Sequence, residues 1–442
     1  MGGLAFVLNS SVIQYSNWPV ADGYITSLNV PANPSAIPKT GTPYSGHGMP
    51  FLHRVVNTLF HHIIILARVI QTYVLNSLFA RKGFPQYETI KSEAERIFYA
   101  GRSELLFEVV RPINNRVKHF GGVSKMNPSD YVTLLPGTSS KRTGPVSCRA
   151  PTTGFRYLNS SLSSAIWNNS TTLPLTFINC ICSSESAVMK PLAIRRPHLY
   201  EGLVAEDVKK RFNAISNEFP QLNWSSLTTE PFILVSFGSV AQAQYMPVEL
   251  AQKFFEAFSQ SPFTIIWQTN SAFESLLWAR NVTVPKNVRL SSWVPVKHIL
   301  AHPNLQYLIS HGGINTINEL LLFGVPMLGG DQVSNLQRLV DLGAAAKMSI
   351  KDIAQGELLT NMRRFERNLD RYWNRMQQLR KMLESHHELH SDIQDFWIGW
   401  TVRNGKRLRG RSFFRLDYIG HTENAFWISL ALSFVSLSVI LY

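Results

Sequence analysis

The sequence contains little cysteine. Only three cysteines, Cys148, Cys180 and Cys182, occur in 442 residues. They are too few and too clustered to define a disulfide framework, and no CxxC pair indicates a zinc site. The cysteine content therefore argues against a disulfide-held scaffold and leaves the redox compartment undetermined.

Acidic residues are also scarce, with 29 Asp and Glu against 43 Lys and Arg, which gives a net charge of +14. Such an excess fits a nucleic acid, an anionic membrane or an anionic ligand as partner. None of the usual nucleic-acid modules is present, so we expect no nucleic-acid partner. Part of the excess is concentrated near the C-terminus, at Arg403, Lys406, Arg407, Arg409, Arg411 and Arg415.

The start of the chain is a poor match to a secretory signal peptide, whereas its end is apolar. "MGGLAFVLNSSVIQY" has no basic n-region. Residues 425–442 carry no charge and approach the ~20 residues that a membrane-spanning helix needs. We expect a single transmembrane helix there, with a buried core helix as the alternative. Glycosylation triplets mildly favour a lumenal chain, and they begin at Asn9, Asn159, Asn168, Asn169, Asn223 and Asn281.

The first half of the chain shows little regular pattern. Residues 1 to about 50 are predicted to be loops, and residues 121–195 are rich in Ser, Thr, Pro and Asn. Residues 51–80 are strongly apolar and predict one long helix or two. We interpret them as a core helix; a helix resting on a membrane is the alternative. A further helical piece is predicted at 87–99.

Beyond Pro231 the pattern becomes regular. Short apolar runs of the buried-strand type, such as "FILVSF", "FTIIWQT" and "LQYLIS", alternate with helical segments. This alternation predicts a parallel sheet covered on both faces, a Rossmann-like domain over residues 231 to about 350. Residues 355–390 are predicted to be charged covering helices.

One motif stands at the end of a predicted strand. His311, Gly312 and Gly313 follow "LQYLIS" and precede a helix that begins near Asn315. In doubly wound sheets ligands bind beyond the carboxyl ends of the strands, and a helix N-terminus there favours a phosphate. Thr316 offers a hydroxyl, and Glu319 could accept hydrogen bonds from a ribose.

The stretch "SSWVPVKHILAHPNLQYLISHGGINTINELLLFGVPMLGGDQ" resembles the donor-binding signature of UDP-glycosyltransferases, in their animal, membrane-anchored, glucuronosyltransferase-like branch. "ILVSFGS" and "FWIGWTVRNG" also match, and "GMPFLHRVVNTL" more loosely resembles the middle of that family's N-terminal domain. The resemblance implies an α/β fold of GT-B type, with two Rossmann-like domains and one C-terminal transmembrane helix. It divides the chain into an incomplete N-terminal acceptor-side domain (1–225), a UDP-sugar-binding domain (226–390), a basic juxtamembrane segment (391–424) and the membrane helix (425–442).

The resemblance also implies roles for individual residues in binding a UDP-sugar. Those expected at the diphosphate are Ser239, His311, Gly313, Asn315 and Thr316. Trp293 would stack on the uracil and Glu319 would hold the ribose. Asp331 and Gln332 would bind hydroxyls of the transferred sugar. The UDP-sugar is a co-substrate, and the resemblance implies neither a cofactor nor a metal.

Two departures from the family pattern fall in the same region. Val296 stands where the family usually has a Gln that pairs with the uracil edge. The segment "GVPMLGGDQ" is about four residues shorter than usual, which should displace Asp331 and Gln332.

The implied activity is transfer of glucuronate or glucose from a UDP-sugar to a small lipophilic acceptor, with inversion and without metal. In the family a histidine paired with an aspartate, both early in the N-terminal domain, deprotonates the acceptor. "GMPFLHRVVN" resembles a segment beyond both, yet it begins at Gly48, so the catalytic residues are unknown. His47 and His53 are the nearest candidates, and we interpret both as solvated loop histidines. We therefore expect weak transfer or none, and the alternative is an inactive UDP-sugar-binding partner subunit or an incomplete version of such an enzyme.

The expected location is the endoplasmic reticulum membrane, crossed once, with the body of the protein in the lumen. The basic run before residue 425 opposes this orientation, because cytoplasmic flanks usually carry Lys and Arg. The expected partners are the UDP-sugar, the acceptor, the membrane and either a second copy of the chain or a related subunit.

Overall fold

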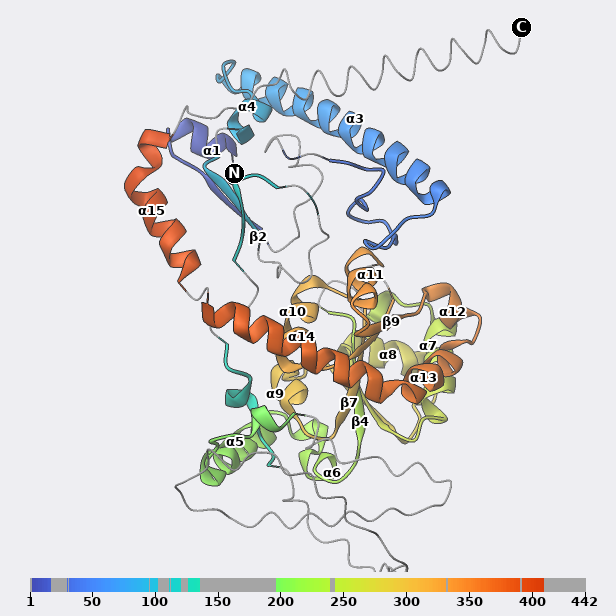
Figure 1. Cartoon of the computed structure of the whole chain (residues 1–442). Coiled ribbons are helices and arrows are strands. Elements are labelled where there is room, and N and C mark those ends of the chain that lie inside the picture. The colour runs from blue at the N-terminus through green and yellow to red at the C-terminus, as the bar shows by residue number, and fades with distance from the viewer. Residues whose placement is uncertain are drawn as a thin grey trace, which may run out of the picture. The chain divides into compact units, whose positions relative to one another are not determined.

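A computed structural model of the chain describes residues 2–16, 30, 32–94, 96–101, 111, 113–120, 126–135, 196–238, 243–330, 333–389 and 392–408. Two parallel sheets organise these residues, a larger one from the second half of the chain and a smaller one from the first half (Figure 1). The predicted α/β class is thereby confirmed.

The larger sheet has six strands: β4 (Phe232–Ser236), β5 (Thr264–Gln268), β6 (Val288–Ser291), β7 (Leu305–Ser310), β8 (Met327–Gly329) and β9 (Ala345–Lys347). Their order across the sheet is β6-β5-β4-β7-β8-β9, and every pairing is parallel. Numbered from its own first strand, this is the order 3-2-1-4-5-6 of the doubly wound dinucleotide-binding fold. The Rossmann-like prediction for this part of the chain is confirmed.

The helices of this half are α5 (Ala205–Glu218), α6 (Trp224–Leu227), α7 (Val248–Ser259), α8 (Ser271–Ala279), α9 (Val296–Ala301), α10 (Ile314–Phe323), α11 (Val333–Asp341), α12 (Ile350–Ala354), α13 (Leu358–Arg367) and α14 (Leu369–Leu389). Contacts join α7 to α12 and α13, and α10 to α9 and α14. Because crossovers between parallel strands are right-handed, these two groups lie on opposite faces: the chain adds β5 and β6 on one side of β4, and β7, β8 and β9 on the other.

The core of this half is built on aromatic packing. Phe254 and Phe258 of α7, one helical turn apart, both contact the buried Trp267 of β5, with ring centroids 5.1 and 5.6 Å away. Phe273 of α8 contacts the same indole at 5.5 Å. Side chains four residues apart lie on one helix face, so this spacing fixes which face of α7 meets the sheet.

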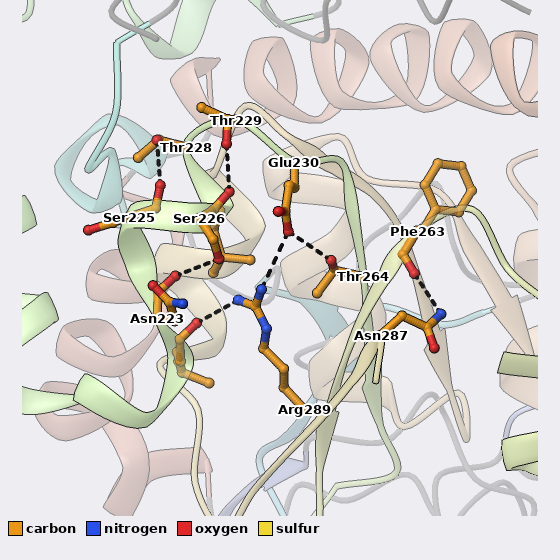
Figure 2. Close-up of polar contacts among 12 residues, drawn as sticks. Asn223, Ser225, Ser226, Thr228, Thr229, Glu230, Phe263, Thr264, Asn287 and Arg289 are labelled. Atoms are coloured by element: carbon orange, nitrogen blue, oxygen red, sulfur yellow. Dashed lines mark hydrogen bonds and ion pairs between the residues drawn. The ribbon is translucent and has the colours of Figure 1, made fainter. Parts of the chain in front are cut away.

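Polar contacts fix the strands at their amino ends, as Figure 2 shows. The Glu230 carboxylate, just before β4, accepts a hydrogen bond from Thr264 at 3.1 Å and forms an ion pair with Arg289 of β6 at 3.4 Å. The Asn287 amide donates to the carbonyl of Phe263 at 3.1 Å. These contacts tie β4, β5 and β6 together at the edge opposite to the one where ligands bind.

The smaller sheet consists of β1 (Ile13–Ser16), β2 (Phe98–Gly101) and β3 (Val117–His119), which pair in parallel in that order. The accompanying helices are α1 (Gly2–Val7), α3 (Phe51–Arg81) and α4 (Thr89–Ala94). Helix α15 (Ile393–Leu408) packs Ile393 and Trp397 against a small cluster on this sheet. Short 3-10 turns lie at Pro128–Tyr131, Pro197–Leu199, Pro220–Leu222 and Ala243–Tyr245.

Two predictions for the first half are wrong in detail. Residues 2–7 and 13–16 are helix and strand, not loops. The helix predicted at 87–99 ends at Ala94, and Phe98 and Tyr99 belong to β2. The physical reason is that β2 pairs with β1, more than eighty positions earlier, and a pairing across that separation leaves no local periodicity. The domain boundaries at 225 and 390 remain predictions.

The long helix α3 corrects a third prediction, because it is not a core helix. In its most apolar 18-residue window only 6% of the residues are buried. Its buried residues are Asn57, His61 and Thr72, all of them polar. Among the described residues α3 is also the helix long and apolar enough to cross a membrane, by length and composition alone. The predicted transmembrane segment 425–442 lies outside the described residues.

Candidate functional site

The site begins where the order of strands reverses. β4 and β7 are neighbours in the sheet, with Ser236 level with Ser310, and the chain leaves them toward opposite sides. In doubly wound domains the loops beyond two such strand ends diverge, and ligands bind in the crevice between them. The loop after β4 carries Gly238, and the loop after β7 carries His311.

The imidazole of His311 lies against two glycines. A Cβ atom at Gly238 would stand 2.8 Å from Cε1 of His311, and one at Gly313 would stand 2.7 Å from Nε2. Gly238 also has φ +75°, which side chains rarely adopt. Nδ1 of His311 lies 3.3 Å from the Ser310 hydroxyl. The ring thus packs against the backbone of both loops at the switch point, and a Cβ at either glycine would force the ring to shift.

Helix α10 starts beside this histidine. Gly313 is its N-cap, no acidic residue occupies its first turn, and the amide of Ile317 donates to the carbonyl of Gly313 at 3.0 Å. The first amides of any helix lack intrahelical acceptors and carry the positive end of the dipole. An anion in the crevice would therefore meet these amides together with the His311 ring.

The faces of α10 separate core residues from site residues. Ile317, Leu320 and Leu321 are buried against the sheet. Asn315 is exposed, while Thr316 and Glu319 are half-buried. The structure therefore brings four predicted residues to one end of the sheet: His311, Gly313, Asn315 and Thr316. Glu319 follows one turn further along the same helix.

Trp293 stands at the same edge of the sheet, after β6. Its side chain is 62% exposed, and its carbonyl accepts a hydrogen bond from the Ser291 hydroxyl at 2.7 Å. Three strand spacings separate β6 from β7, which is about 14 Å, roughly the length of an extended nucleoside diphosphate. Val296, where the family pattern has a Gln, is half-buried and packs against the main core.

Three predicted residues, Ser239, Asp331 and Gln332, lie outside the described residues. The last described positions before them are Gly238 and Gly330. The amide of Gly330 donates to the Ser310 carbonyl at 3.2 Å, so the end of β8 joins the switch point. Sequence reasoning missed Ser310 and Gly330. The signal for Gly330 was the glycine pair after "VPML", since a Cβ there would stand 2.7 Å from the Met348 carbonyl.

Two histidines, His198 and His302, have strongly shifted pKa values. Burial lowers the pKa of His302 to about 3, with Arg196 as a smaller cause. Burial, followed by the nearby Arg380, lowers the pKa of His198 to about 3. His302 precedes β7, and Arg196 donates to its carbonyl at 2.7 Å. His302 and its partner Arg196 thus lie near the amino end of β7, the end opposite to His311.

The catalytic base stays unassigned. His53 stacks its ring on Tyr44 with centroids 4.4 Å apart, and the exposed His47 has its ring Nε2 3.3 Å from the backbone carbonyl of Asp341. Neither contact supplies a carboxylate to orient an imidazole as a base. In the described ranges no group of three or more His, Cys, Asp or Glu is arranged to hold a metal ion.

A known protein family matches the half of the chain that contains the larger sheet. Residues 207–422 match the model of the family "UDP-glucoronosyl and UDP-glucosyl transferase". A UDP-glucuronosyltransferase of Pleuronectes platessa is 31% identical over 180 residues, 39% of this chain and 35% of that protein. UDP-glucuronosyltransferase 3A1 of Homo sapiens is 32% identical over 136 residues, 30% of this chain and 25% of that protein. The glycotransferase of kitacinnamycin, a solved structure, aligns with a TM-score of 0.46 and 14% identity, over 89% of this chain and 71% of that one.

The strand order and its switch point define a domain of the doubly wound α/β class. The match of residues 207–422 to the UDP-glucoronosyl and UDP-glucosyl transferase model, together with these relatives, supports a UDP-glycosyltransferase of the UGT type and confirms the resemblance seen in the sequence. The aligned regions span 35% and 25% of the lengths of these two relatives.

Proposed function

We propose that the switch-point crevice of this chain binds UDP-glucuronate or UDP-glucose and presents the sugar to a small lipophilic acceptor. The observation that carries the proposal is the placement of His311 between Gly238 and Gly313 at the N-terminus of α10. This arrangement offers backbone amides and an imidazole to one anionic group, which suits the diphosphate of a nucleotide sugar.

The proposed contacts run along the carboxyl edge of the sheet. The exposed ring of Trp293 stacks on the uracil, and Glu319 accepts hydrogen bonds from the ribose. His311, with Gly313, Asn315, Thr316 and Ser239, holds the diphosphate. Asp331 and Gln332 bind hydroxyls of the sugar. In the proposed fold of GT-B type, the acceptor enters from the N-terminal half.

The proposed chemistry is a displacement with inversion. The acceptor oxygen attacks the anomeric carbon on the face opposite to UDP, the bond from that carbon to the diphosphate oxygen breaks, and the acceptor proton passes to a base. The α10 amides and His311 stabilise the charge that develops on the departing diphosphate, in place of a metal. This electrostatic part of the reaction belongs to residues of the larger sheet.

A second candidate is a UDP-sugar-binding subunit with weak transfer of its own. The observation that favours it is the environment of the two rings: His47 contacts the backbone carbonyl of Asp341 at 3.3 Å and His53 stacks on Tyr44, so neither contact is with a carboxylate. General-base catalysis contributes about 10² to 10⁴-fold, so binding without a base leaves turnover hard to detect. We propose a homo- or hetero-oligomer as the assembly in which such a subunit acts.

Calorimetry on the full-length chain in detergent tests the binding proposal. UDP should bind, and Trp293→Ala should weaken it by roughly 1–3 kcal/mol, the scale of base–aromatic stacking. The matched control is Trp278→Ala, because Trp278 is 87% exposed on α8 and has no proposed contact with UDP. Absence of UDP binding to the unchanged chain would remove the proposal.

Incubation with labelled UDP-glucose or UDP-glucuronate and a panel of phenols and steroids separates the two candidates. Weak or absent product with intact UDP binding supports the subunit. Robust product that disappears in His47→Ala identifies the base and supports the enzyme.

We also propose that the body of the chain lies in the lumen of the endoplasmic reticulum and that residues 425–442 cross its membrane once. Three described acceptor asparagines, Asn9, Asn223 and Asn281, are exposed, which supports this orientation. Glycosidase treatment should increase the mobility of the expressed chain. Ser225→Ala and Thr283→Ala, which remove two triplets while keeping their asparagines, should each reduce the shift. An unchanged mobility after treatment would contradict the lumenal orientation.

A further inference from the structure

Helix α3 buries polar side chains and exposes apolar ones, the reverse of a helix in a globular core. Large apolar side chains on its outer surface include Leu59, Ile63, Leu66, Ile70 and Tyr73, of which Ile63 is 62% and Tyr73 74% exposed. Monomeric soluble proteins rarely expose a contiguous apolar surface of this length, since 31 helical residues extend over about 46 Å. Something apolar is therefore expected to cover it.

The opposite stripe of α3 is polar and already occupied. The Asn57 side chain accepts from the Lys39 amide at 2.8 Å and donates to the carbonyls of Pro34 and Ile37 at 2.6 and 2.8 Å. The polar residues of this stripe recur at spacings of four or seven positions, which places them on one face of the helix. They are Asn57, His61, Arg68, Thr72 and Asn76.

Toward the C-terminal end of α3, the residues on this stripe bind Thr89 and Glu93 of α4. Arg68 forms an ion pair with Glu93, and the Asn76 carbonyl oxygen accepts from the Thr89 amide at 2.9 Å and from its hydroxyl at 2.7 Å. The Lys39 ammonium lies 2.7 Å from Nδ1 of His61. These bonds hold α3 to protein along its length, so the polar face cannot turn toward an apolar medium without losing them.

This one-sided attachment decides how α3 can meet a membrane. A helix that spans the hydrocarbon must satisfy its polar groups within it, and α3 would carry the loop at residues 34–42 and α4 along. A helix lying in the interface buries only its apolar face, by about 5–10 Å, and keeps its polar face with the protein. The hydrogen bonds of Asn57 and Asn76 and the Arg68–Glu93 ion pair favour the second arrangement.

Charge indicates the kind of surface. Residues 51–87 contain no Asp or Glu, while Arg54, Arg81 and Lys82 are exposed. Basic residues at an apolar helix favour anionic lipid headgroups, by electrostatic attraction added to apolar burial. A second protein chain would need acidic groups placed to match these three positions, whereas an anionic bilayer supplies them everywhere.

We infer that α3 is an interfacial membrane-binding helix, which lies on an anionic bilayer with Leu59, Ile63, Leu66, Ile70 and Tyr73 in the lipid. This contact is independent of the UDP-sugar site and of any helix at residues 425–442. It holds the N-terminal half of the chain at the lipid surface, where lipophilic molecules concentrate.

Photocrosslinking of the full-length chain tests the inference without removing any segment. The chain is bound to vesicles of phosphatidylcholine with about 30% phosphatidylserine that contain an acyl-chain diazirine lipid. After irradiation, trypsin cleavage at Arg54, Arg68 and Arg81 gives the α3 peptides 55–68 and 69–81 for mass spectrometry. Lipid adducts are expected on both peptides, at the outer residues and not at Asn57 or Thr72.

Paired variants show that the apolar face is responsible. The double variant Leu59→Glu, Ile63→Glu should reduce adducts on both peptides roughly tenfold or more, because each change removes a lipid-buried apolar side chain. The matched control, Trp278→Glu, changes an exposed apolar residue outside α3 and should leave them unchanged. Vesicles without phosphatidylserine should give fewer adducts.

Three results would overturn the inference. Adducts confined to other peptides would show that α3 does not touch lipid. Equal labelling of Thr72 and Tyr73 would show a helix surrounded by lipid, as in a span. A dimer that forms without α3 adducts and dissociates in Ile63→Glu would show that a second copy covers the face.

Discussion

Two apolar helices of this chain have opposite environments. In α10, Ile317, Leu320 and Leu321 are buried in the core around the larger sheet, whereas Asn315 is exposed and Thr316 half-buried. In α3 the polar residues Asn57 and Thr72 are buried, and the apolar residues face outward. The apolar content of a helix therefore does not show which of its faces is buried. That depends on which face forms hydrogen bonds to the protein or packs against it.

The largest expected difference between the two helices concerns stability. Leu320→Ala in α10 should lower the free energy of unfolding by about 2–5 kcal/mol, because the fully buried side chain leaves a cavity. Leu66→Ala in α3 should change it by less than about 0.5 kcal/mol, since Leu66 is exposed. Chemical denaturation in detergent, followed by circular dichroism, measures both. Equal losses would contradict the comparison.

Acid should destabilise the half of the chain that contains the larger sheet. The Asn304 amide donates to Nδ1 of the buried His302 at 3.2 Å, which requires a neutral ring, and burial holds the folded pKa at about 3. Below the unfolded pKa near 6.5 only the unfolded state gains this proton, so stability is present above pH ~6.5 and falls as the pH drops from there toward about 3.

At pH 5 the loss from His302 should be about 2 kcal/mol relative to pH 7. Denaturation curves at both pH values measure it, and His302→Gln should flatten the pH dependence by about one proton. An identical slope in the variant would show that His302 is not the titrating group.

Within α3, the polar stripe should matter more than the apolar face. Asn57→Ala leaves the Lys39 amide and the carbonyls of Pro34 and Ile37 without this partner, at a cost of roughly 1–2 kcal/mol. Leu59→Ala, two positions away and exposed, is the control with little expected effect in the absence of lipid. Proteolysis rates of α3 in native conditions compare the two variants. A greater loss in Leu59→Ala would show that this face packs on protein.

The smallest expected effect is local to the crevice. Gly238→Ala places a Cβ 2.8 Å from Cε1 of His311 at a φ of +75°, so the ring must shift. UDP affinity should fall about five- to tenfold, roughly 1 kcal/mol. Gly202→Ala is a control with a similar positive φ and open space around it. Calorimetry that finds equal UDP affinity in both variants would show that the position of the ring does not control binding.

Sequence alone determined the larger sheet. Runs such as "FILVS" and "LQYLIS" are buried on both faces, and they alternate with helices at a spacing typical of a parallel sheet covered on both faces. The position of His311 beyond a strand end followed from the same pattern. That signal is local, because burial on both faces leaves an uninterrupted apolar run wherever it occurs.

Only the tertiary structure decided the rest. The contact of Gly238 with His311 joins loops more than seventy residues apart, and β1 pairs with β2 across a similar separation. The orientation of α3 depended on hydrogen bonds from residues 34–42 and from α4, which no periodicity within the helix encodes. An amphipathic pattern shows that a helix has two faces. Which face meets protein is decided by the partners that the fold brings to it.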